Sequence, residues 1–502
     1  MTDMPQDEIS RLRKLYRTMV TAREMDLIEQ SYTARGEAFF HVSGAGHEGS
    51  IALIPHLTQD DWLHCHYRDK ALMLARGITP EQFFLSLFNK DGSHSRGRQM
   101  NAHMSAPELK VLSIVGPVGN SALQAAGIAE VVREDPGNPL VLCALGEGTT
   151  QEGEVIEAIG HSVRAELPVL FVIQDNAFAI STKTTGQTFY SYPQGEAESF
   201  YGVPITRIDG RDVTSAGQVF GPVVEAIRRD RRPQIVVFQV DRLHNHTNAD
   251  DQRMYRSSDE LESAARTGDP VARLRDHLIR NGVDESSLSE MEDRVRADLR
   301  EAARTAQFSA EPSACPAAKA PLPGHLTGEQ IEYRGGQERE LVMLEAIREV
   351  LDARLESDER ITLFGEDIED PKGDVFGITR GLSQKYGRRV RNSPLSESLI
   401  MGVSIGRALA GEHPVGFLQF ADFLPIAYNQ IFAELGSMYW RTDGGWQVPV
   451  ILMVTAGGYR PGLGPFHAST LEALVAHTPG VDVFMPSDAA DAAGLLNAAF
   501  DS

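Results

Sequence analysis

Two oxygen-bearing side chains follow two neighbouring apolar stretches of the sequence. The stretch 140–145 leads to Glu147 and the stretch 169–173 leads to Asn176, with a helical pattern between them. Because parallel strands deliver their carboxyl ends to the same edge of a sheet, we expect these two side chains to lie close together. Carboxylate and amide oxygens are ligands that suit Mg²⁺. The alternative is an ordinary strand-to-helix turn that carries an acid on the surface.

Glycines flank this glutamate on both sides. Gly146 and Gly148 carry no side chain, so the backbone around Glu147 can approach a phosphate group closely. The pattern therefore predicts a site for a magnesium ion and a phosphate-bearing ligand.

The elements that would position these residues alternate along the chain. Strand-like runs and helical patterns follow one another before residue 309 and again after residue 338. Such alternation implies parallel sheets covered by helices. We therefore predict an α/β protein with two doubly wound domains, residues 1–308 and 339–502. The segment 309–338, rich in Ala and Pro at its start, is predicted to be a linker between them.

Composition narrows the class of protein. A chain of 502 residues with 42% hydrophobic residues can bury two or three cores. Its net charge of −22 argues against a nucleic-acid or anionic-membrane partner. The three cysteines are scattered and form neither a metal-binding spacing nor a disulfide framework. No apolar run approaches about 18 residues, so a reduced, soluble, cytoplasmic protein is expected.

The first pattern resembles the thiamine diphosphate motif, in which Gly-Asp-Gly is followed at a similar separation by Asn-Asn. Residues 149–174 separate the two parts here, Glu147 stands for the aspartate, and Asp175 stands for the first asparagine. Glutamate at this position is similar to the branched-chain 2-oxo acid dehydrogenases. The resemblance implies that Glu147, Asn176 and the backbone carbonyl of Phe178 bind Mg²⁺.

Other motifs before the linker resemble the same family. Tyr67 and Arg68 look like its Tyr-Arg pair, whose arginine binds the diphosphate, a task that suits a planar guanidinium. Val118, in the segment 116–119, looks like the residue beneath the cofactor rings, and His246 like the histidine of the active-site loop. The alternatives are a solvated surface position for Arg68, core packing for Val118, and a metal-binding histidine pair at residues 244 and 246.

Thiamine chemistry also needs a carboxylate that stabilises the imino form of the cofactor. The segment 393–397, Ser-Pro-Leu-Ser-Glu, resembles the family's Thr-Pro-Ile-Ser-Glu, which implies that Glu397 is the catalytic glutamate. The alternative is a first-turn helix acid. Glu366, Phe423 and His467 lie in motifs that follow in the family's order. The resemblance implies that Phe423 packs on the aminopyrimidine and that His467 faces the substrate.

Together these motifs resemble the thiamine-diphosphate-dependent first component of 2-oxo acid dehydrogenase complexes, over nearly all of residues 15–500. The resemblance implies oxidative decarboxylation of a branched-chain or similar aliphatic 2-oxo acid, with acyl transfer to a lipoyl-bearing acyltransferase. The implied catalytic residues are Glu397, His246 and His467. The implied contacts to thiamine diphosphate are Tyr67, Arg68, Gly116, Val118, Gly146, Glu147, Gly148, Thr149, Asn176, His246, Glu366, Glu397 and Phe423. An acyloin or ketol transferase and a non-catalytic assembly subunit are the alternatives.

The two regions usually lie on separate α-type and β-type chains in this family, whereas here they share one chain. The β-type chain continues into a C-terminal transketolase-type domain, and this sequence stops at Ser502. We expect a homo-oligomer, at least a dimer. For the C-terminal domain three explanations stay open: a separate chain supplies it, the sequence is truncated, or the acyl acceptor differs.

Overall fold

The computed structural model describes residues 4–313, 339–458 and 461–502. The chain divides into two units, the first mainly Met1–Ala125 and Val132–Ser313, the second mainly Ala314–Trp440 and Trp446–Ser502. Most of the predicted linker lies outside the described residues. Of its first residues, Ala310 accepts a backbone hydrogen bond of 3.0 Å from Asp91 in the first unit.

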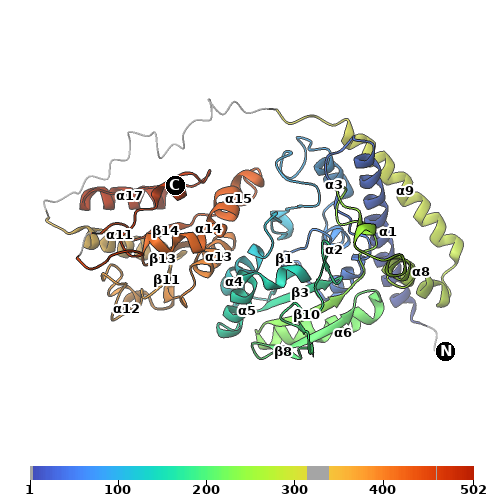
Figure 1. Ribbon diagram of the computed structural model, residues 1–502, viewed down its shortest axis with the longest axis horizontal. Helices are drawn as coiled ribbons and strands as arrows, with labels where there is room; N and C mark the ends of the chain where they lie inside the picture. Colours follow the sequence, from blue (N-terminus) through green and yellow to red (C-terminus); the bar gives the residue numbers. More distant parts are fainter. Residues whose placement is uncertain (1–3, 314–338, 459–460) are drawn as a thin grey trace. The chain divides into compact units, whose positions relative to one another are not determined.

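A six-stranded sheet forms the centre of the first unit (Figure 1). Neighbouring strands pair in parallel except at one edge, where β8 runs antiparallel to β9. The inner strands are apolar and buried, as expected for a parallel sheet that is covered on both faces. In sheet order the strands are β1 (Trp62–His64), β2 (Val141–Gly146), β3 (Val169–Asp175), β10 (Gln234–Gln239), β9 (Val203–Asp209) and β8 (Ser199–Phe200).

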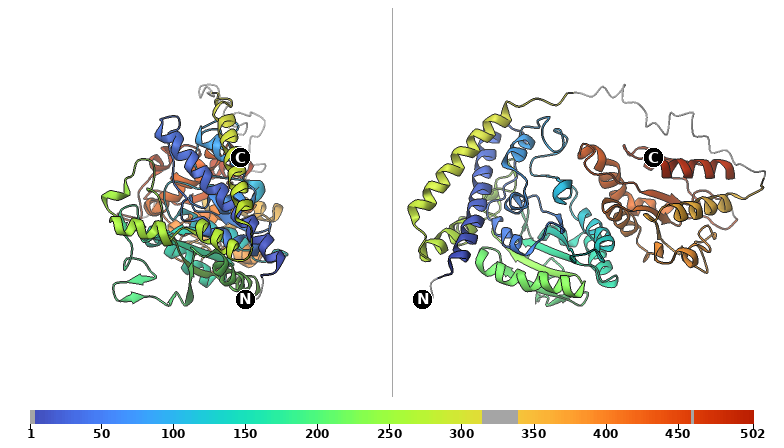
Figure 2. Two further views of the ribbon diagram at one scale, coloured as in Figure 1. Left: turned by 90° about the vertical axis from the view of Figure 1, so that its right-hand side faces the viewer. Right: turned by 180° about the vertical axis from the view of Figure 1, so that it is seen from behind.

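Helices surround this sheet. The long helices α1 and α9 run side by side in Figures 1 and 2, and the hydroxyl of Tyr16 on α1 donates a 2.6 Å hydrogen bond to Glu292 on α9. Helix α9 begins where the side chain of Asp284 accepts from the N–H of Ser287, as an N-cap aspartate does. The helices are α1 (Gln6–Ala34), α2 (Lys70–Arg76), α3 (Pro80–Leu87), α4 (Asn120–Val132), α5 (Gly153–Arg164), α6 (Val213–Asp230), α7 (Ser258–Thr267), α8 (Pro270–Arg280) and α9 (Glu285–Gln307).

Short pairs of antiparallel strands lie in the loops of the first unit. The hairpin of β4 (Phe178–Ala179) and β5 (Thr182–Lys183) follows β3 directly. A second pair joins β6 (Ser191–Tyr192) and β7 (Gly195–Glu196).

The second unit is built on a four-stranded sheet, and all of its strands are parallel. The order is β12 (Val390–Asn392), β11 (Ile361–Gly365), β13 (His413–Leu418) and β14 (Ile451–Val454). Helices α11 and α17 pack together, with Leu351, Leu355 and Leu496 in the core and Arg354 bonded to Asn497. The helices are α11 (Met343–Ser357), α12 (Leu382–Tyr386), α13 (Glu397–Leu409), α14 (Leu424–Asn429), α15 (Gly436–Arg441), α16 (Glu472–Ala476) and α17 (Ala489–Asp501).

The prediction of an α/β protein with two parallel sheets is confirmed. Cys65 and Cys143 are buried free thiols, and Cys315 lies outside the described residues. Within the described part of the chain, no helix combines the length and apolar character needed to cross a membrane.

Candidate active site

Four neighbouring strands of the first unit end at one edge of the sheet, and each is followed by a predicted site residue. Arg68 follows β1, Glu147 follows β2, Asn176 follows β3, and His246 lies in the segment after β10. In parallel sheets this carboxyl edge is where ligands bind. The topology therefore gathers residues that are far apart in the sequence; we call this group the first edge.

Glu147 opens a 3₁₀ turn, η3 (Glu147–Gln151), and its side chain is only 2% exposed. The alternative of a surface acid is therefore wrong. Its Oε2 lies 3.5 Å from both the backbone nitrogen and Nδ2 of Asn176. Burial, and then the charge of Asp175, raises the pKa of Glu147 to about 7. The buried Oδ1 of Asn176 has no hydrogen-bond partner in the described part of the chain.

The turns around Glu147 are tightly packed. A Cβ on Gly148 would lie 2.6 Å from the Cβ of Ala179, a distance that only glycine avoids. Asp175 accepts a 2.9 Å hydrogen bond from the N–H of Ala177, whose φ is +66°. Asp175 thus closes the turn that leads from Asn176 to Phe178, which gives a structural role to its departure from the family motif.

Arg68 is buried, at 2% exposure, so the solvated surface alternative is wrong. Its guanidinium donates to the carbonyl oxygen of Ser43 and, at 2.8 Å, to Nδ1 of His246, and it lies over the ring of Tyr67. Among the described residues, no carboxylate forms a hydrogen bond or ion pair with Arg68. A buried cation without an anionic partner is costly unless an anion binds it.

His246 is held in a defined orientation. Its backbone N–H donates at 2.7 Å to Asp250, which also accepts from the hydroxyl of Tyr255 at 2.6 Å. Burial, and then the charge of Arg68, lowers the pKa of His246 to about 4, so the imidazole is neutral at pH 7. Because Arg68 donates to Nδ1, the proton lies on Nε2. His244 has a different partner, Ser43, at 3.2 Å, which gives no support to the alternative of a histidine metal pair.

The segment 116–119 is open. Val118 is 46% exposed, so the alternative of core packing is wrong. Gly119 precedes α4 with a φ of +94°, and a Cβ there would lie 3.0 Å from the Cβ of Glu152, close to the end of η3. The position of a Cβ on Gly116 has no neighbour within 4 Å. Gly116 and Val118 are therefore available to a ligand, and their contact with one stays a prediction.

The second unit repeats the arrangement at the carboxyl edge of its own sheet. Glu366 follows β11, and Gln419 follows β13 and donates its side-chain N–H to the carbonyl of Glu366. Glu397 is the first residue of α13, whose N-cap is Ser396. Glu397 is thus an acid in the first turn of a helix, as the alternative to a catalytic role proposed. It also lies close enough to Glu366 to influence its charge. Burial, and then the charge of Glu397, raises the pKa of Glu366 to about 7.

Aromatic residues follow the end of β13, the strand next to β11 in this sheet. Phe423 ends the turn η7 (Ala421–Phe423) that follows β13, and the ring of His467 meets it edge-on at 5.7 Å. The same imidazole lies 4.9 Å from the ring of Phe420. The loop that carries His467 is tied to this turn, since the N–H of Ser469 donates to Asp422 at 3.1 Å. The structure therefore brings Phe423 and His467 together, with His467 exposed.

Sequence reasoning missed the buried polar residues behind the first edge. Asp26 and Glu29 of α1 are buried, although both are acids. A signal was present, because these two acids continue the helical spacing of the buried residues Leu12, Leu15, Met19 and Ala22. His66 and His103, which flank the ring of Tyr67, were also missed.

The chemistry of the first edge fits a diphosphate bound through a divalent cation. Glu147 and the unpartnered oxygen of Asn176 supply hard ligands, while the guanidinium of Arg68 supplies a positive charge for the anion. In the second unit, the carboxyls of Glu366 and Glu397 can accept a proton, and Phe423 offers an aromatic surface. That combination suits a ring that carries basic nitrogens.

Comparison with known proteins agrees with this chemistry. Residues 16–315 match the family described as "Dehydrogenase E1 component". The chain belongs to this family. Residues 339–502 match the family described as "Transketolase, pyrimidine binding domain". The prediction that both types of region occur together in one chain is confirmed.

Several curated relatives of this E1 chain are named as alpha subunits of 2-oxoisovalerate dehydrogenase. It is 28% identical over 302 residues to the 2-oxoisovalerate dehydrogenase subunit alpha 2, mitochondrial, of Arabidopsis thaliana, covering 60% of this chain and 64% of the relative. It is 28% identical over 283 residues to the mitochondrial 2-oxoisovalerate dehydrogenase subunit alpha of Mus musculus, covering 56% of this chain and 62% of that protein. The chain thus spans somewhat less than two thirds of the length of these relatives.

Proposed function

We propose that this E1 chain uses thiamine diphosphate and Mg²⁺ to decarboxylate an aliphatic 2-oxo acid and passes the acyl group to a lipoyl-bearing acyltransferase. The observation that supports this most directly is the first edge, where the buried carboxyl of Glu147, the unpartnered Oδ1 of Asn176 and the buried guanidinium of Arg68 converge. A pyrimidine-binding region on the same chain supports the same proposal.

Each half of the chain has its own task in this proposal. Glu147, Asn176 and the carbonyl of Phe178 would bind Mg²⁺, while Arg68 would bind the diphosphate. When bound, thiamine diphosphate supplies a carbon nucleophile for the 2-oxo carbon and a place for the electrons released with carbon dioxide. Glu397 would hold a proton at the pyrimidine ring nitrogen, and Phe423 would pack on that ring.

The two histidines have the chemistry expected for acyl transfer. The neutral imidazole of His246 offers an Nε2–H donor, and His467 is accessible on an exposed loop. We propose that both act on the substrate side. The relatives are named for 2-oxoisovalerate, which supports a branched substrate for this chain as well. The cytoplasmic location and the homo-oligomeric state stay predictions.

Calorimetric titration of the full chain with thiamine diphosphate, with and without Mg²⁺, tests the proposal. Glu147→Gln keeps the size of the side chain and resembles its protonated form, but it removes a hard ligand from the cation. Its affinity for the cofactor in the presence of Mg²⁺ should fall about a hundredfold, since even weaker perturbations around metal sites cost about 10–100-fold. The matched control is Glu262→Gln, which makes the same charge change on the exposed face of α7.

Glu262→Gln should bind as wild type does. If Glu147→Gln retains wild-type affinity and metal dependence, Glu147 does not bind the cation and the proposal fails at its main observation. Tight binding with no turnover of any 2-oxo acid would instead favour the non-catalytic assembly subunit.

A further inference from the structure

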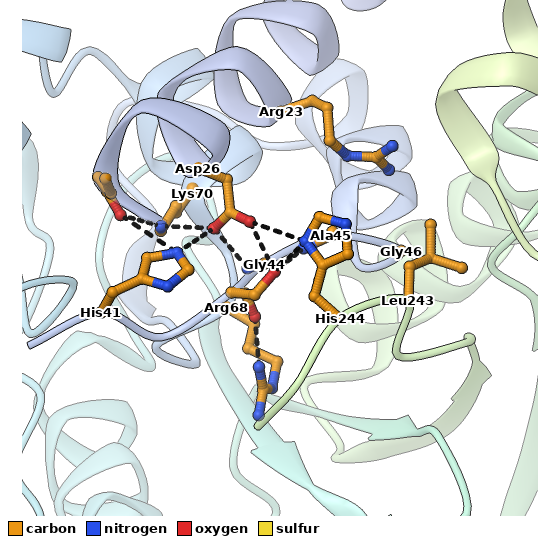
Figure 3. A network of polar contacts seen from close by, with 12 residues as sticks. Arg23, Asp26, His41, Gly44, Ala45, Gly46, Arg68, Lys70, Leu243 and His244 are labelled. Carbon is orange, nitrogen blue, oxygen red and sulfur yellow. Dashed lines mark hydrogen bonds and ion pairs between the residues drawn. The ribbon is translucent and has the colours of Figure 1, made fainter. Parts of the chain in front are cut away.

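A buried polar network lies behind Arg68 in the first unit (Figure 3). Its centre is the carboxylate of Asp26 on α1, which is 1% exposed. This carboxylate accepts from the hydroxyl of Ser43 at 2.6 Å, from Lys70 at 2.8 Å, from the N–H of Gly44 at 3.0 Å, and contacts Nε2 of His41 at 3.2 Å. Burial opposes its ionisation, but Lys70 and the hydrogen-bond donors outweigh burial and hold the pKa of Asp26 well below its usual range.

The network is not arranged to bind a metal ion. Asp26, Glu29 and His41 each place one potential ligand atom within 4.8 Å of the others. The ammonium group of Lys70, however, already binds the carboxylates of both Asp26 and Glu29. A second cation there would be repelled by Lys70, whose ammonium group already balances part of the negative charge of the two carboxylates.

Ser43 connects this network to the first edge. Its hydroxyl donates to Asp26 and accepts from the N–H of Ala45 at 3.2 Å, while its carbonyl oxygen accepts from the guanidinium of Arg68. The chain is also packed closely at the next residue, because a Cβ on Gly44 would lie 2.9 Å from the carbonyl oxygen of Arg68. The N–H of Gly44, which belongs to the same peptide group as the Ser43 carbonyl, also donates to Asp26, so Asp26 holds this carbonyl in position through both the hydroxyl of Ser43 and that N–H.

The guanidinium of Arg68 itself donates only to neutral acceptors among the described residues. These are the carbonyl of Ser43, Nδ1 of His246 at 2.8 Å and the carbonyl of His246 at 3.4 Å. Each acceptor orients a guanidinium nitrogen without neutralising its charge. The side chain is thus ordered before any ligand binds, which lowers the conformational entropy that binding would otherwise lose.

We propose that Ser43 and Asp26 are positioning residues that hold Arg68 in the orientation needed to bind a diphosphate. This inference rests on the proposed function, since it assumes that Arg68 meets the diphosphate. Lys70 and Glu29 support Asp26, and Asp26 acts on the ligand only through Ser43 and Arg68. The diphosphate affinity of the chain therefore depends in part on the Ser43 hydroxyl, which acts through Arg68.

The test uses the full chain and inorganic pyrophosphate with Mg²⁺, measured by calorimetry. Ser43→Ala removes the hydroxyl and keeps the carbonyl. The dissociation constant for pyrophosphate should rise about tenfold, the size expected for losing one hydrogen bond that positions a charged group. Ser86→Ala is the matched control, since Ser86 is also buried in the first unit and its hydroxyl has no hydrogen-bond partner among the described residues. This control should bind pyrophosphate as wild type does.

A double-mutant cycle separates positioning from a general loss of structure. Arg68→Met, Ser43→Ala and the double variant are titrated with thiamine diphosphate, whose other contacts keep the affinity measurable. If Ser43 acts through Arg68, adding Ser43→Ala to Arg68→Met changes the dissociation constant less than about twofold, because the coupled partner is already gone. Asp26→Asn perturbs the bonds from both the Ser43 hydroxyl and the Gly44 N–H, so it should weaken binding at least as much as Ser43→Ala does, and its thermal midpoint is measured to show that it folds.

The outcomes distinguish a failure of the proposed function from a failure of the positioning role alone. If Arg68→Met binds as wild type does, the diphosphate role of Arg68 fails and the proposed function fails with it. If Arg68→Met weakens binding but Ser43→Ala lowers only the thermal midpoint, the positioning role alone is overturned. Independent, multiplying effects of the two substitutions would likewise overturn it.

Discussion

The carboxyl of Glu366 should make the stability of the folded chain depend on pH near neutrality. The side chain is 2% exposed, and its Oε1 has no hydrogen-bond partner in the described part of the chain. Burial, and then the charge of Glu397, raises its pKa from 4.5 to about 7. The folded chain therefore favours the protonated form of Glu366, whereas the unfolded chain ionises it at ordinary acidic pH.

The magnitude follows from this difference in pKa. Each pKa unit corresponds to about 1.4 kcal/mol, so the raised pKa is worth at most about 3 kcal/mol of unfolding free energy. The contribution is fully present below about pH 4.5 and is lost as the pH rises through about 7. Glu366→Gln replaces the protonated carboxyl by a neutral group of similar size. The variant should therefore gain stability relative to wild type as the pH rises from 5 to 8.

Thermal and urea unfolding of the full chain at several pH values checks this expectation. The quantity compared is the difference in midpoint between Glu366→Gln and wild type, which cancels titrations shared by both proteins. Glu472→Gln, on exposed α16, is the control and should follow the wild-type profile. Glu397→Gln should move the loss of stability to lower pH, because it removes the second cause of the shift. Parallel profiles for Glu366→Gln and wild type would refute the reasoning.

Glu397→Gln should lower the decarboxylation rate by several orders of magnitude because an acid–base partner is lost, while the affinity for thiamine diphosphate changes far less. Single-turnover kinetics measures the rate and calorimetry measures the affinity. A variant that stays active would contradict the catalytic role of Glu397. Decarboxylation should be faster with 2-oxoisovalerate than with pyruvate, and equal or reversed rates would remove the support for a branched substrate. Mixing the inactive variants Glu147→Ala and Glu397→Gln should restore a fraction of the activity if one site takes its two halves from different chains. Mixed dimers identified by mass without activity would show that each site is formed by one chain.

The spacing of residues close together in the sequence was enough to predict that Glu147 and Asn176 lie at neighbouring strand ends of the first edge. Two short apolar runs, each ending in an oxygen-bearing residue, predict adjacent parallel strands, and β2 and β3 do pair in parallel with Gly146 opposite Gln174. The alternation of strand-like and helical patterns after residue 338 likewise predicted a second parallel sheet, which the structure contains. These features depend on residues close together in the chain, where periodicity and turn residues determine the structure.

Contacts across long separations could not be derived in this way. Arg68 and His246 meet because β1 and β10 lie in one sheet, and no periodicity in either segment specifies that sheet order. Their roles were predicted only from the resemblance to a family. The burial of Asp26 was missed for a related reason. An acid on a helix is usually solvated, and Asp26 is buried because polar partners outside α1, namely Ser43, Gly44, Lys70 and His41, bind its carboxylate.

Glu147 and Glu366 have similar environments at the carboxyl ends of their sheets. Glu147 and Glu366 each follow a buried strand, each is almost fully buried, and each has a pKa raised to about 7 chiefly by burial. A carboxylate in that position lacks the compensation that water would give it. A divalent cation at Glu147 would supply that compensation from outside the protein. At Glu366, the charge of the nearby Glu397 makes the cost larger, so Glu366 is partly protonated near neutral pH. Glu147 can thus bind a cation, and Glu366 can hold a proton. The proposed chemistry requires both properties.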